Sequence, residues 1–210
     1  IKVKKWIVSI LVIILFCGIR FSDPWFLDMV RLKALDQHQR TQQETITEKI
    51  VTVEIDNDSI RENGQWPWPR NELAKDIEEL YRMGAAIVVV PILFADADRM
   101  GGDEMFATAL AYAPSVIAMF EDGKGQYPKS TGTVIKGNDT GGILTMGVKE
   151  NFYTYENILQ GIASAPTEVD QLVRRVPLLL RTPEGWVASF GTQIYKALFG
   201  VKSYIITTNE

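Results

Sequence analysis

Two tryptophans and one arginine stand close together in the segment GQWPWPR, residues 64–70. Each proline fixes its own φ angle and restricts the residue before it, so the spacing predicts a stiff, extended, polyproline-like segment. Trp66 and Trp68 would then project beside the cation of Arg70 and could form an aromatic and cationic wall of a ligand pocket. The competing interpretation is a structural lock, in which both indoles pack over a sheet and Arg70 satisfies nearby carboxylates. The residue types alone favour the lock.

Asp56 and Asp58 are the carboxylates that this lock would use. They follow the β-favouring run IVTVEI, residues 50–55, which predicts a first strand that ends at Asp56. A helix is expected to begin at Arg70 and to return over the same sheet. In a βαβ unit, the carboxyl end of the strand and the amino end of the helix lie at the same rim. We therefore expect Arg70 to pair with Asp56 or Asp58 beneath the two indoles.

A second stretch with possible chemistry is GGDEMF, residues 101–106. It is similar to the GGDEF signature of diguanylate cyclases, in which a β-hairpin binds guanine, phosphate and Mg²⁺, but Met105 is inserted before the aromatic residue. Here the stretch opens into DEMFATALAYA, whose apolar residues have helical spacing. Asp103 is then a capping or first-turn acid, which the helix dipole stabilises. The stretch predicts a loop and a helix start rather than a nucleotide-binding hairpin.

The composition is that of a globular protein, with 46% apolar and 23% charged residues and a net charge of −4. This acidic balance gives no reason to expect nucleic acid as a partner. The single Cys17 and the single His38 cannot build a disulfide framework or a Cys-rich zinc site, and we expect Cys17 to be a small buried hydrophobe. Because no Ser/His/Asp set, nucleotide loop or paired-carboxylate cleft is evident, we expect neither catalysis nor a cofactor in this segment.

The N-terminal residues have the pattern of a membrane anchor. Lys2, Lys4 and Lys5 precede an uninterrupted apolar run over residues 6–19, and flanking aromatic residues extend it toward the ~20 residues that cross a bilayer. A cleaved signal peptide is the alternative, but no small-residue cleavage site follows the run. We expect residues 1–21 to be a cytoplasmic start and an anchor, with the rest outside the cytoplasm. The chain begins without Met, so we also expect residues to precede it.

Behind the anchor, the pattern predicts a helical stalk over residues 22–48 and an α/β domain over 49–210. After the first strand come an amphipathic helix over 71–84 and a buried strand over 85–94. A helix, a strand, a loop or irregular hairpin, a two-stranded hairpin, a helix and a final strand follow, over residues 103–114, 115–122, 123–142, 172–190, 191–200 and 201–208. This order predicts a mainly parallel or mixed central sheet with flanking helices, incomplete at its C-terminus.

Residues 50–98 resemble the opening of a type-2 CHASE domain, the extracellular sensory domain associated with cyclases and histidine kinases. The matching residues are Asp56, Asp58, Ser59, Gly64, Trp66, Pro67, Trp68, Pro69, Arg70, Gly84, Ala85, Ile92 and Phe94. Downstream, VDQLVRRVPLLL resembles the Asp-Gly-x-x-Arg-Arg-x-Pro-Leu strand of that family through Asp170, Arg174, Arg175, Pro177 and Leu178. Pro91 and Gln171 depart from the pattern, which usually has Asp and Gly there. The change at Pro91 removes a carboxylate from the end of a strand.

The resemblance spans about residues 25–210 and implies the sensory module of a bacterial receptor in the inner membrane. Its output domain would be a cytoplasmic nucleotide cyclase, kinase or GGDEF domain. The implied partners are the membrane, further copies of the chain, and a small-molecule or protein signal. The candidate ligand-binding or lock residues are Asp56, Asp58, Trp66, Trp68, Arg70, Phe94, Arg174 and Arg175. The alternative is a domain that assembles protomers and binds no small ligand.

Overall fold

The computed structural model describes residues 5–43, 47–112, 114–130, 132–138, 141–145, 147–152, 155 and 157–208. The chain divides into two compact units. Unit 1 consists of Ile1–Val53 and Thr167–Arg174, and unit 2 of Glu54–Pro166 and Arg175–Glu210. The segment Thr167–Arg174 therefore interrupts unit 2 along the sequence but packs within unit 1.

Unit 1 contains two helices that meet at a sharp elbow. Helix α1 (Lys5–Ser22) and helix α2 (Trp25–Arg40) are bent by 81° relative to each other. Asp23, between them, has a positive φ of 38°. Its carboxylate forms an ion pair with one arginine of each helix: Arg20 Nη1 of α1 lies at 3.4 Å and Arg31 Nη2 of α2 at 2.6 Å. A helix lies within the predicted stalk, but it covers Trp25–Arg40 rather than residues 22–48, and Pro24 occupies its N-cap.

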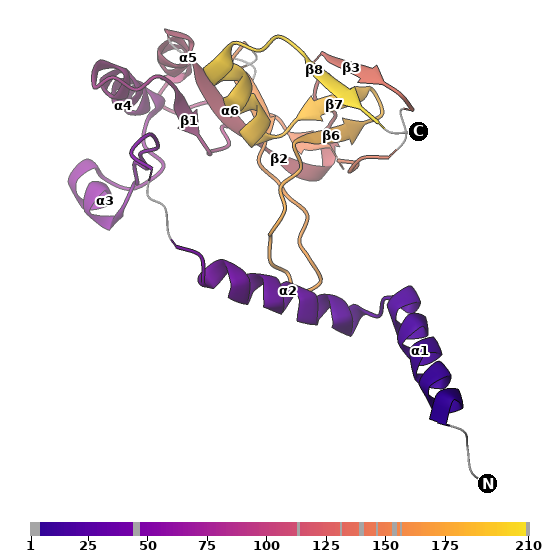
Figure 1. Ribbon diagram of the computed structural model, residues 1–210. Helices are drawn as coiled ribbons and strands as arrows, with labels where there is room; N and C mark the ends of the chain where they lie inside the picture. Colours follow the sequence, from indigo (N-terminus) through magenta and orange to yellow (C-terminus); the bar gives the residue numbers. More distant parts are fainter. Residues whose placement is uncertain are drawn as a thin grey trace. The chain divides into compact units, whose positions relative to one another are not determined.

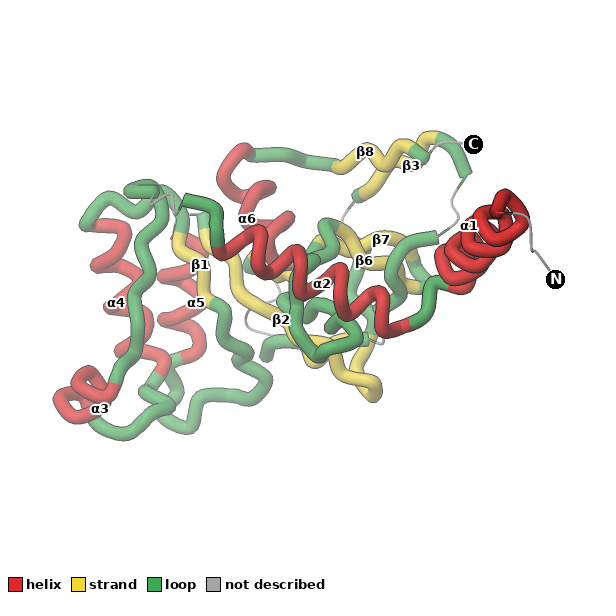
Figure 2. Tube along the Cα trace, turned by 60° about the horizontal axis from the view of Figure 1, so that its bottom comes forward, coloured by secondary structure: helices red, strands yellow, loops and turns green. Residues whose placement is uncertain are grey.

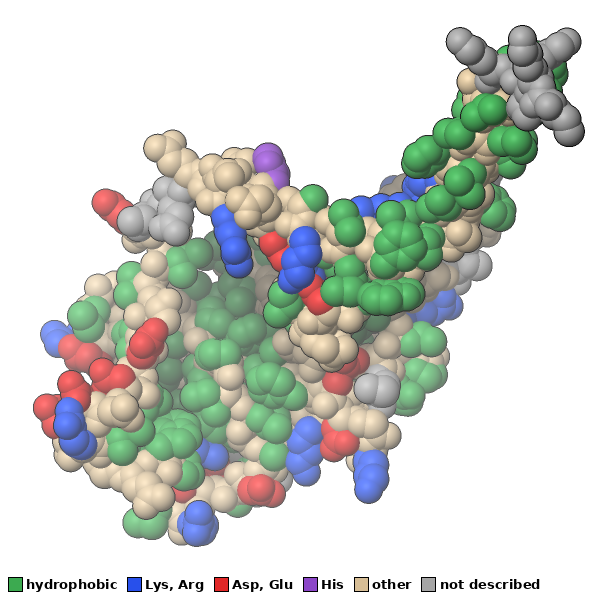
Figure 3. Space-filling view, turned by 90° about the horizontal axis from the view of Figure 1, so that it is seen from below, with side chains coloured by type: hydrophobic (Ala, Val, Ile, Leu, Met, Phe, Trp, Pro, Cys, Tyr) green, Lys and Arg blue, Asp and Glu red, His purple; other side chains and the backbone are tan. Residues whose placement is uncertain are grey.

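Most of the described side chains of α1 are exposed. Apart from the half-buried Ile7, its large apolar residues from Trp6 to Phe16 are 44–66% exposed, and hydrophobic side chains gather along this helix in Figure 3. Cys17, predicted to be buried, is exposed as well, because α1 is not packed against the rest of the chain at this point. Among the described residues, no helix on its own is both long and apolar enough to cross a bilayer, and α1 and α2 satisfy that criterion only together, as a bent pair.

The predicted first strand is wrong. Residues 50–56 belong to no strand in the part of the chain that the structure describes, and the apolar side chains from Ile50 to Ile55 are 38–81% exposed. A β-favouring composition produces a strand only where a neighbouring strand and a covered face are present. The acids that follow begin the short helix α3 (Asn57–Asn63) instead. Asp56 is its N-cap, and the Ser59 N–H donates to the Asp56 carboxylate at 2.8 Å.

The next four elements of unit 2 follow the predicted order. They are α4 (Arg70–Arg82), β1 (Val88–Val90), α5 (Asp103–Tyr112) and β2 (Ser115–Gln126). α4 buries Leu73, Ala74 and Ile77 at helical spacing, as its amphipathic pattern predicts. β1 is much shorter than the apolar run over 85–94, because it stops at Pro91, which has no N–H to donate to a neighbouring strand.

The central sheet is built around β2. Its first half pairs in parallel with β1 on one side and β5 (Leu159–Ile162) on the other, and its second half pairs antiparallel with β4 (Val148–Lys149). Residues 115–119 are all buried, which is typical of a strand covered on both faces. α4 and α5 pack against each other, and α6 (Phe190–Phe199) packs on β2 and β5 (Figures 1 and 2). The prediction of a mixed α/β sheet with flanking helices is confirmed.

The remaining strands form two small pairs. β6 (Leu179–Thr182) and β7 (Gly185–Ala188) make the predicted antiparallel hairpin. β3 (Thr133–Lys136), from the stretch expected to be a loop or an irregular hairpin, pairs in parallel with the final strand β8 (Tyr204–Thr207). This pairing joins residues about 70 positions apart, which periodicity along the sequence does not reveal.

Candidate functional site

The segment Gly64–Pro69 packs its tryptophans against the core of unit 2. The chain bends over residues 65–67 instead of running straight, so the predicted extended path is wrong. Trp68 is buried, and its indole N–H donates to the Gly64 carbonyl at 2.8 Å. Trp66 is half-buried and meets Trp68 edge-on, with ring centroids 5.8 Å apart. Both indoles therefore contribute to packing over the N-terminal end of α4.

The predicted pairing of Arg70 with Asp56 or Asp58 is also wrong. Asp56 caps α3, and the exposed Asp58 pairs with Arg61 one turn later in the same helix. Arg70 instead faces Asp103, with its Nε 3.9 Å from Oδ1 of that carboxylate. The physical reason is the missing strand over residues 50–56, without which the two acids do not lie at the rim of the sheet.

Arg70 lies in a largely buried environment, with its side chain 13% exposed. The guanidinium carbon is 4.3 Å from the centroid of the Phe94 ring, which is a cation–π contact. Its Nε is buried and has no hydrogen-bond partner among the described residues, because 3.9 Å to Asp103 is beyond hydrogen-bonding distance. Stacking and charge attraction, rather than a forked hydrogen bond, hold this arginine.

Asp103 is the acceptor at the centre of the group. The Tyr155 O–H donates to its Oδ1 at 2.5 Å, and the backbone N–H of Asp98 donates to its Oδ2 at 2.6 Å. Tyr155 is fully buried and packs against Phe94 and Phe106, with centroid distances of 5.8 Å to each ring. Burial raises the pKa of Tyr155, and the hydrogen bond to Asp103 raises it further. Tyr155 therefore stays protonated and acts as a fixed hydrogen-bond donor.

Asp98 ties the loop before α5 to the first residue of α4. Its carboxylate accepts the backbone N–H groups of Arg70, Met100 and Gly102 at 2.9, 3.2 and 3.0 Å. Burial raises the pKa of Asp98, but the three N–H donors together outweigh burial and lower the pKa overall. Gly102 lies so close to α4 that a Cβ there would meet the Asn71 nitrogen at 2.4 Å. We call Arg70, Phe94, Asp98, Asp103 and Tyr155 the Arg70 cluster.

The predicted interpretation of GGDEMF as a loop and a helix start is confirmed. α5 begins at Asp103, and Gly101 has a φ of 79°, which suits a glycine in a turn. Both oxygens of Asp103 accept internal donors, and the residue is only 8% exposed. This carboxylate is therefore committed to Tyr155 and Asp98, and it does not form the hairpin edge that binds Mg²⁺ in cyclases.

Sequence reasoning missed two members of the Arg70 cluster and partly identified a third. It placed Asp103 in the first turn of a helix but did not find its partners. Asp98 could have been suggested by its position two residues before Met100 in a polar turn, where Asp commonly accepts backbone N–H groups. Tyr155 lies in a stretch of sequence with no periodic pattern, and no signal in the sequence relates it to Asp103.

Arg174 belongs to a second cluster, which lies in unit 1. It donates Nε and Nη2 to Asp36 of α2 at 2.7 and 2.9 Å, and Nη1 and Nη2 to Asp170 at 2.7 Å each. Its side chain is only 5% exposed, and Lys33 Nζ lies 3.5 Å from Asp170. We call Asp36, Asp170 and Arg174 the Arg174 latch. The neighbouring Arg175 is exposed and belongs to unit 2.

The latch is a charge-assisted network, because one planar guanidinium is shared between two carboxylates. The hydrogen bonds from Arg174 lower the pKa of Asp170 and of Asp36. The hydrogen bond to Asp170, followed by the one to Asp36, raises the pKa of Arg174. All three groups are therefore charged at neutral pH. Neither Asp36 nor its pairing with Arg174, 138 positions away, was predicted from the sequence.

The latch should be stable at neutral pH and lost in acid. A carboxylate with a lowered pKa stabilises the folded contact above its unfolded pKa of about 4, and it loses that effect as the pH falls through the pKa of the folded state. We expect a nitroxide on Leu172→Cys, in a chain that also carries Cys17→Ser, to be immobilised at pH 7 and to become mobile only below about pH 4. Its line shape in electron paramagnetic resonance measures this. Mobility that rises between pH 8 and pH 6 would contradict the assignment.

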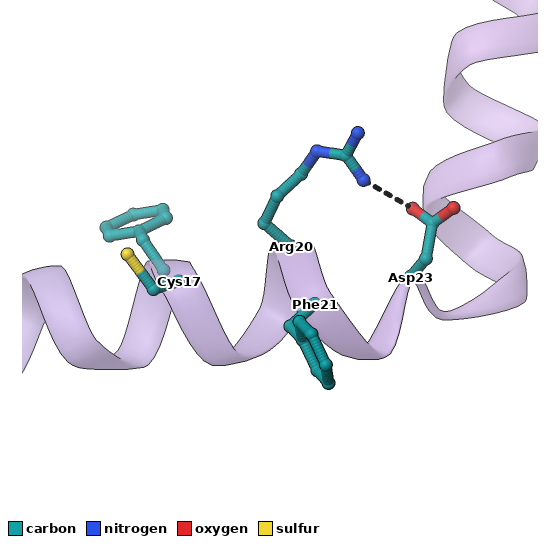
Figure 4. Close-up of a pocket in the computed structure, with 5 residues that line it drawn as sticks. Cys17, Arg20, Phe21 and Asp23 are labelled. Atoms are coloured by element: carbon teal, nitrogen blue, oxygen red, sulfur yellow. Dashed lines mark hydrogen bonds and ion pairs between the residues drawn. The ribbon is translucent and has the colours of Figure 1, made fainter. Parts of the chain in front are cut away.

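A shallow, open hollow of about 740 Å³ lies at the elbow of unit 1, lined by Phe16, Cys17, Arg20, Phe21 and Asp23. In Figure 4, Arg20 turns toward Asp23, while Phe21 points away on the opposite side of α1. None of these residues belongs to the Arg70 cluster or to the Arg174 latch. Three of its five lining residues, Phe16, Cys17 and Phe21, are apolar and come from α1.

Comparison with known proteins identifies the family. Residues 10–208 match the family model of the CHASE2 domain, which covers nearly the whole chain. No curated protein and no solved structure is detectably similar to it. The matched residues include the part of α1 from residue 10 onward, all of α2, the Arg70 cluster and the Arg174 latch.

Proposed function

We propose that this chain, which belongs to the CHASE2 family of extracellular sensory domains in signalling proteins, is the input segment of a membrane-anchored bacterial receptor. In this proposal α1 is the anchor, unit 2 lies outside the cytoplasm, and a small-molecule or protein signal acts on it. The response is passed to a cytoplasmic output domain, a nucleotide cyclase or a kinase.

The observation that carries the proposal is the family match over residues 10–208. The exposed apolar surface of α1 supports the anchor, because a helix that is apolar all round is stable only inside a protein core or a bilayer. Lys2 and Lys4 precede this helix and Lys5 is its first residue, which favours a cytoplasmic N-terminus. Arg20, at the other end, can reach the headgroup region with its long side chain.

A topology reporter tests the anchor and its direction. Alkaline phosphatase fused after Glu210 of the membrane-expressed chain should be active, because this enzyme folds only outside the cytoplasm. A green fluorescent protein that requires the cytoplasm should stay dark at the same position. Replacing Lys2, Lys4 and Lys5 by glutamate should lower the phosphatase activity, because the N-terminus then has a weaker preference for the cytoplasmic side. A chain that remains in the soluble fraction, or that activates only the cytoplasmic reporter, would contradict the proposal.

A domain that assembles protomers without a small ligand is the second candidate. The observation in its favour is the apolar outer face of α6, where Tyr195, Leu198 and Phe199 are 51–61% exposed. The rings of Tyr195 and Phe199 are in contact, with centroids 4.4 Å apart and planes tilted by 40°. Sedimentation of the complete chain in detergent after removal of all small molecules distinguishes the two functions. Self-association that Leu198→Lys abolishes favours assembly, and saturable binding of a metabolite to a monomer favours sensing.

A further inference from the structure

The segment Thr167–Arg174 makes an unusual excursion from unit 2. It lies between β5 and β6, two strands of unit 2, yet it packs in unit 1 beside α2. In Figure 1 the orange loop that contains this segment reaches α2. Helix α2 is therefore connected to unit 2 in two ways: through the chain that follows it, and through this loop.

The Arg174 latch is the contact that holds the loop on α2. Arg174 makes two hydrogen bonds to Asp36 across 138 positions of sequence, and two more to Asp170 within its own loop. Leu32, the one residue of α2 counted as buried among those described, lies one helical turn before Asp36. Residues four apart share a helix face, so Leu32 and Asp36 present an apolar and a charged contact on the same side.

Apart from the pair of Lys33 with Asp170, the other ion pairs that the structure gives for α2 are local. Arg31 pairs with Asp28 three residues away and with Asp23 at the elbow, and Lys33 lies 3.9 Å from Asp36. Such pairs support the helix or its bend but cannot report a movement elsewhere in the chain. The contacts of Asp36 with Arg174 and of Lys33 with Asp170 connect the helix to a loop whose two ends are strands of unit 2.

We propose that the Arg174 latch is the positioning contact that passes a movement of the loop between β5 and β6 to α2, and through α2 to the elbow with α1. This inference rests on the proposed sensory function and names how the input reaches the membrane side. A displacement of β5 or β6 moves the loop, and the shared guanidinium transfers that movement to Asp36. Arg174 is suited to this role because its planar guanidinium donates two parallel hydrogen bonds to a carboxylate. Such a pair fixes the orientation of the carboxylate as well as its distance from the arginine.

The test measures the distance between α2 and the loop in the complete chain. Nitroxides are placed on Gln39→Cys and Leu172→Cys in the Cys17→Ser background, and pulsed electron resonance gives the distance distribution in detergent. We expect one narrow distribution for this parent. Asp36→Asn and Arg174→Gln should each broaden it by several ångströms, and Arg174→Lys should restore it only in part, because an ammonium cannot bind both carboxylates in a forked geometry.

Asp28→Asn is the matched control, because it makes the same substitution on the same helix but removes only the local pair with Arg31. It should leave the distribution narrow. A second readout, the near-ultraviolet circular dichroism and melting temperature of unit 2, separates positioning from folding. The proposal requires that Asp36→Asn change the distance while shifting that melting temperature by less than about 2 °C.

Two results would overturn the inference. One is an unchanged distance distribution in Asp36→Asn. The other is a melting temperature of unit 2 that falls together with the distance, which would make the latch a structural contact only. Because the measurement is made in detergent, it does not depend on which side of a membrane unit 2 occupies. An inverted topology reporter would therefore refute the proposed function and leave the latch result intact.

Discussion

Asp103→Ala is expected to lower the free energy of unfolding of unit 2 by about 3–5 kcal/mol, which is the usual cost of removing one partner from a buried charged pair. The substitution leaves the Tyr155 hydroxyl and the Asp98 N–H without their acceptor, and it leaves the cation of Arg70 without a facing carboxylate. Chemical denaturation of the chain, followed by tryptophan fluorescence, measures the change.

Glu104→Ala is the control for this experiment. Glu104 is the next residue in the first turn of the same helix, but it is exposed. Its loss removes only an acid near the positive end of the helix dipole, so we expect the free energy of unfolding to fall by less than about 1 kcal/mol. Tyr155→Phe, which deletes one hydroxyl, should fall between the two at about 1–3 kcal/mol. Equal effects of Asp103→Ala and Glu104→Ala would mean that the Arg70 cluster does not stabilise unit 2.

Gly102→Ala is expected to have the second largest effect and to lower the free energy of unfolding by about 1–3 kcal/mol. This is the usual cost of adding atoms to a site that is already well packed. A Cβ at position 102 would lie 2.4 Å from the Asn71 nitrogen and 3.0 Å from the carbonyl carbon of Arg70. These are backbone atoms of α4, so the helix or the loop has to move. The movement would also strain the hydrogen bond from the Gly102 N–H to Asp98.

Gly191→Ala gives the opposite expectation and so controls for the general effect of the substitution. Gly191 lies in α6, and nothing is within 4 Å of the position of an added Cβ. Alanine there should stabilise the helix by about 0.5–1 kcal/mol. Thermal unfolding of both variants measures the contrast. A Gly102→Ala chain that melts at or above the wild-type temperature would show that α4 and the loop before α5 are not in close contact.

The family could be identified from the sequence because its signature is local. The Trp-Pro-Trp-Pro-Arg run and the later Arg-Arg-x-Pro-Leu run are short, and the family match over residues 10–208 confirms the resemblance. The helices α4, α5 and α6 and the hairpin of β6 and β7 were also predictable. Amphipathic spacing and turn residues specify such elements within a few neighbouring positions.

Partners distant in sequence could not be predicted in the same way. Arg70 was assigned to Asp56 and Asp58 because a strand was expected over residues 50–55, and a β-favouring run does not show whether a neighbouring strand will accept it. The structure gives Arg70 a different carboxylate, Asp103, which the sequence placed correctly at the start of a helix but without a partner.

The sequence by itself determined the family, the order of most helices and strands, and the apolar N-terminal helix, because each depends on residue types over a few turns or one strand. Only the tertiary structure decided that Tyr155 donates to Asp103 and that Arg174 holds Asp36. These contacts join residues 52 and 138 positions apart. A charged or polar side chain specifies what kind of partner it requires, but which partner it meets depends on how the chain between them folds.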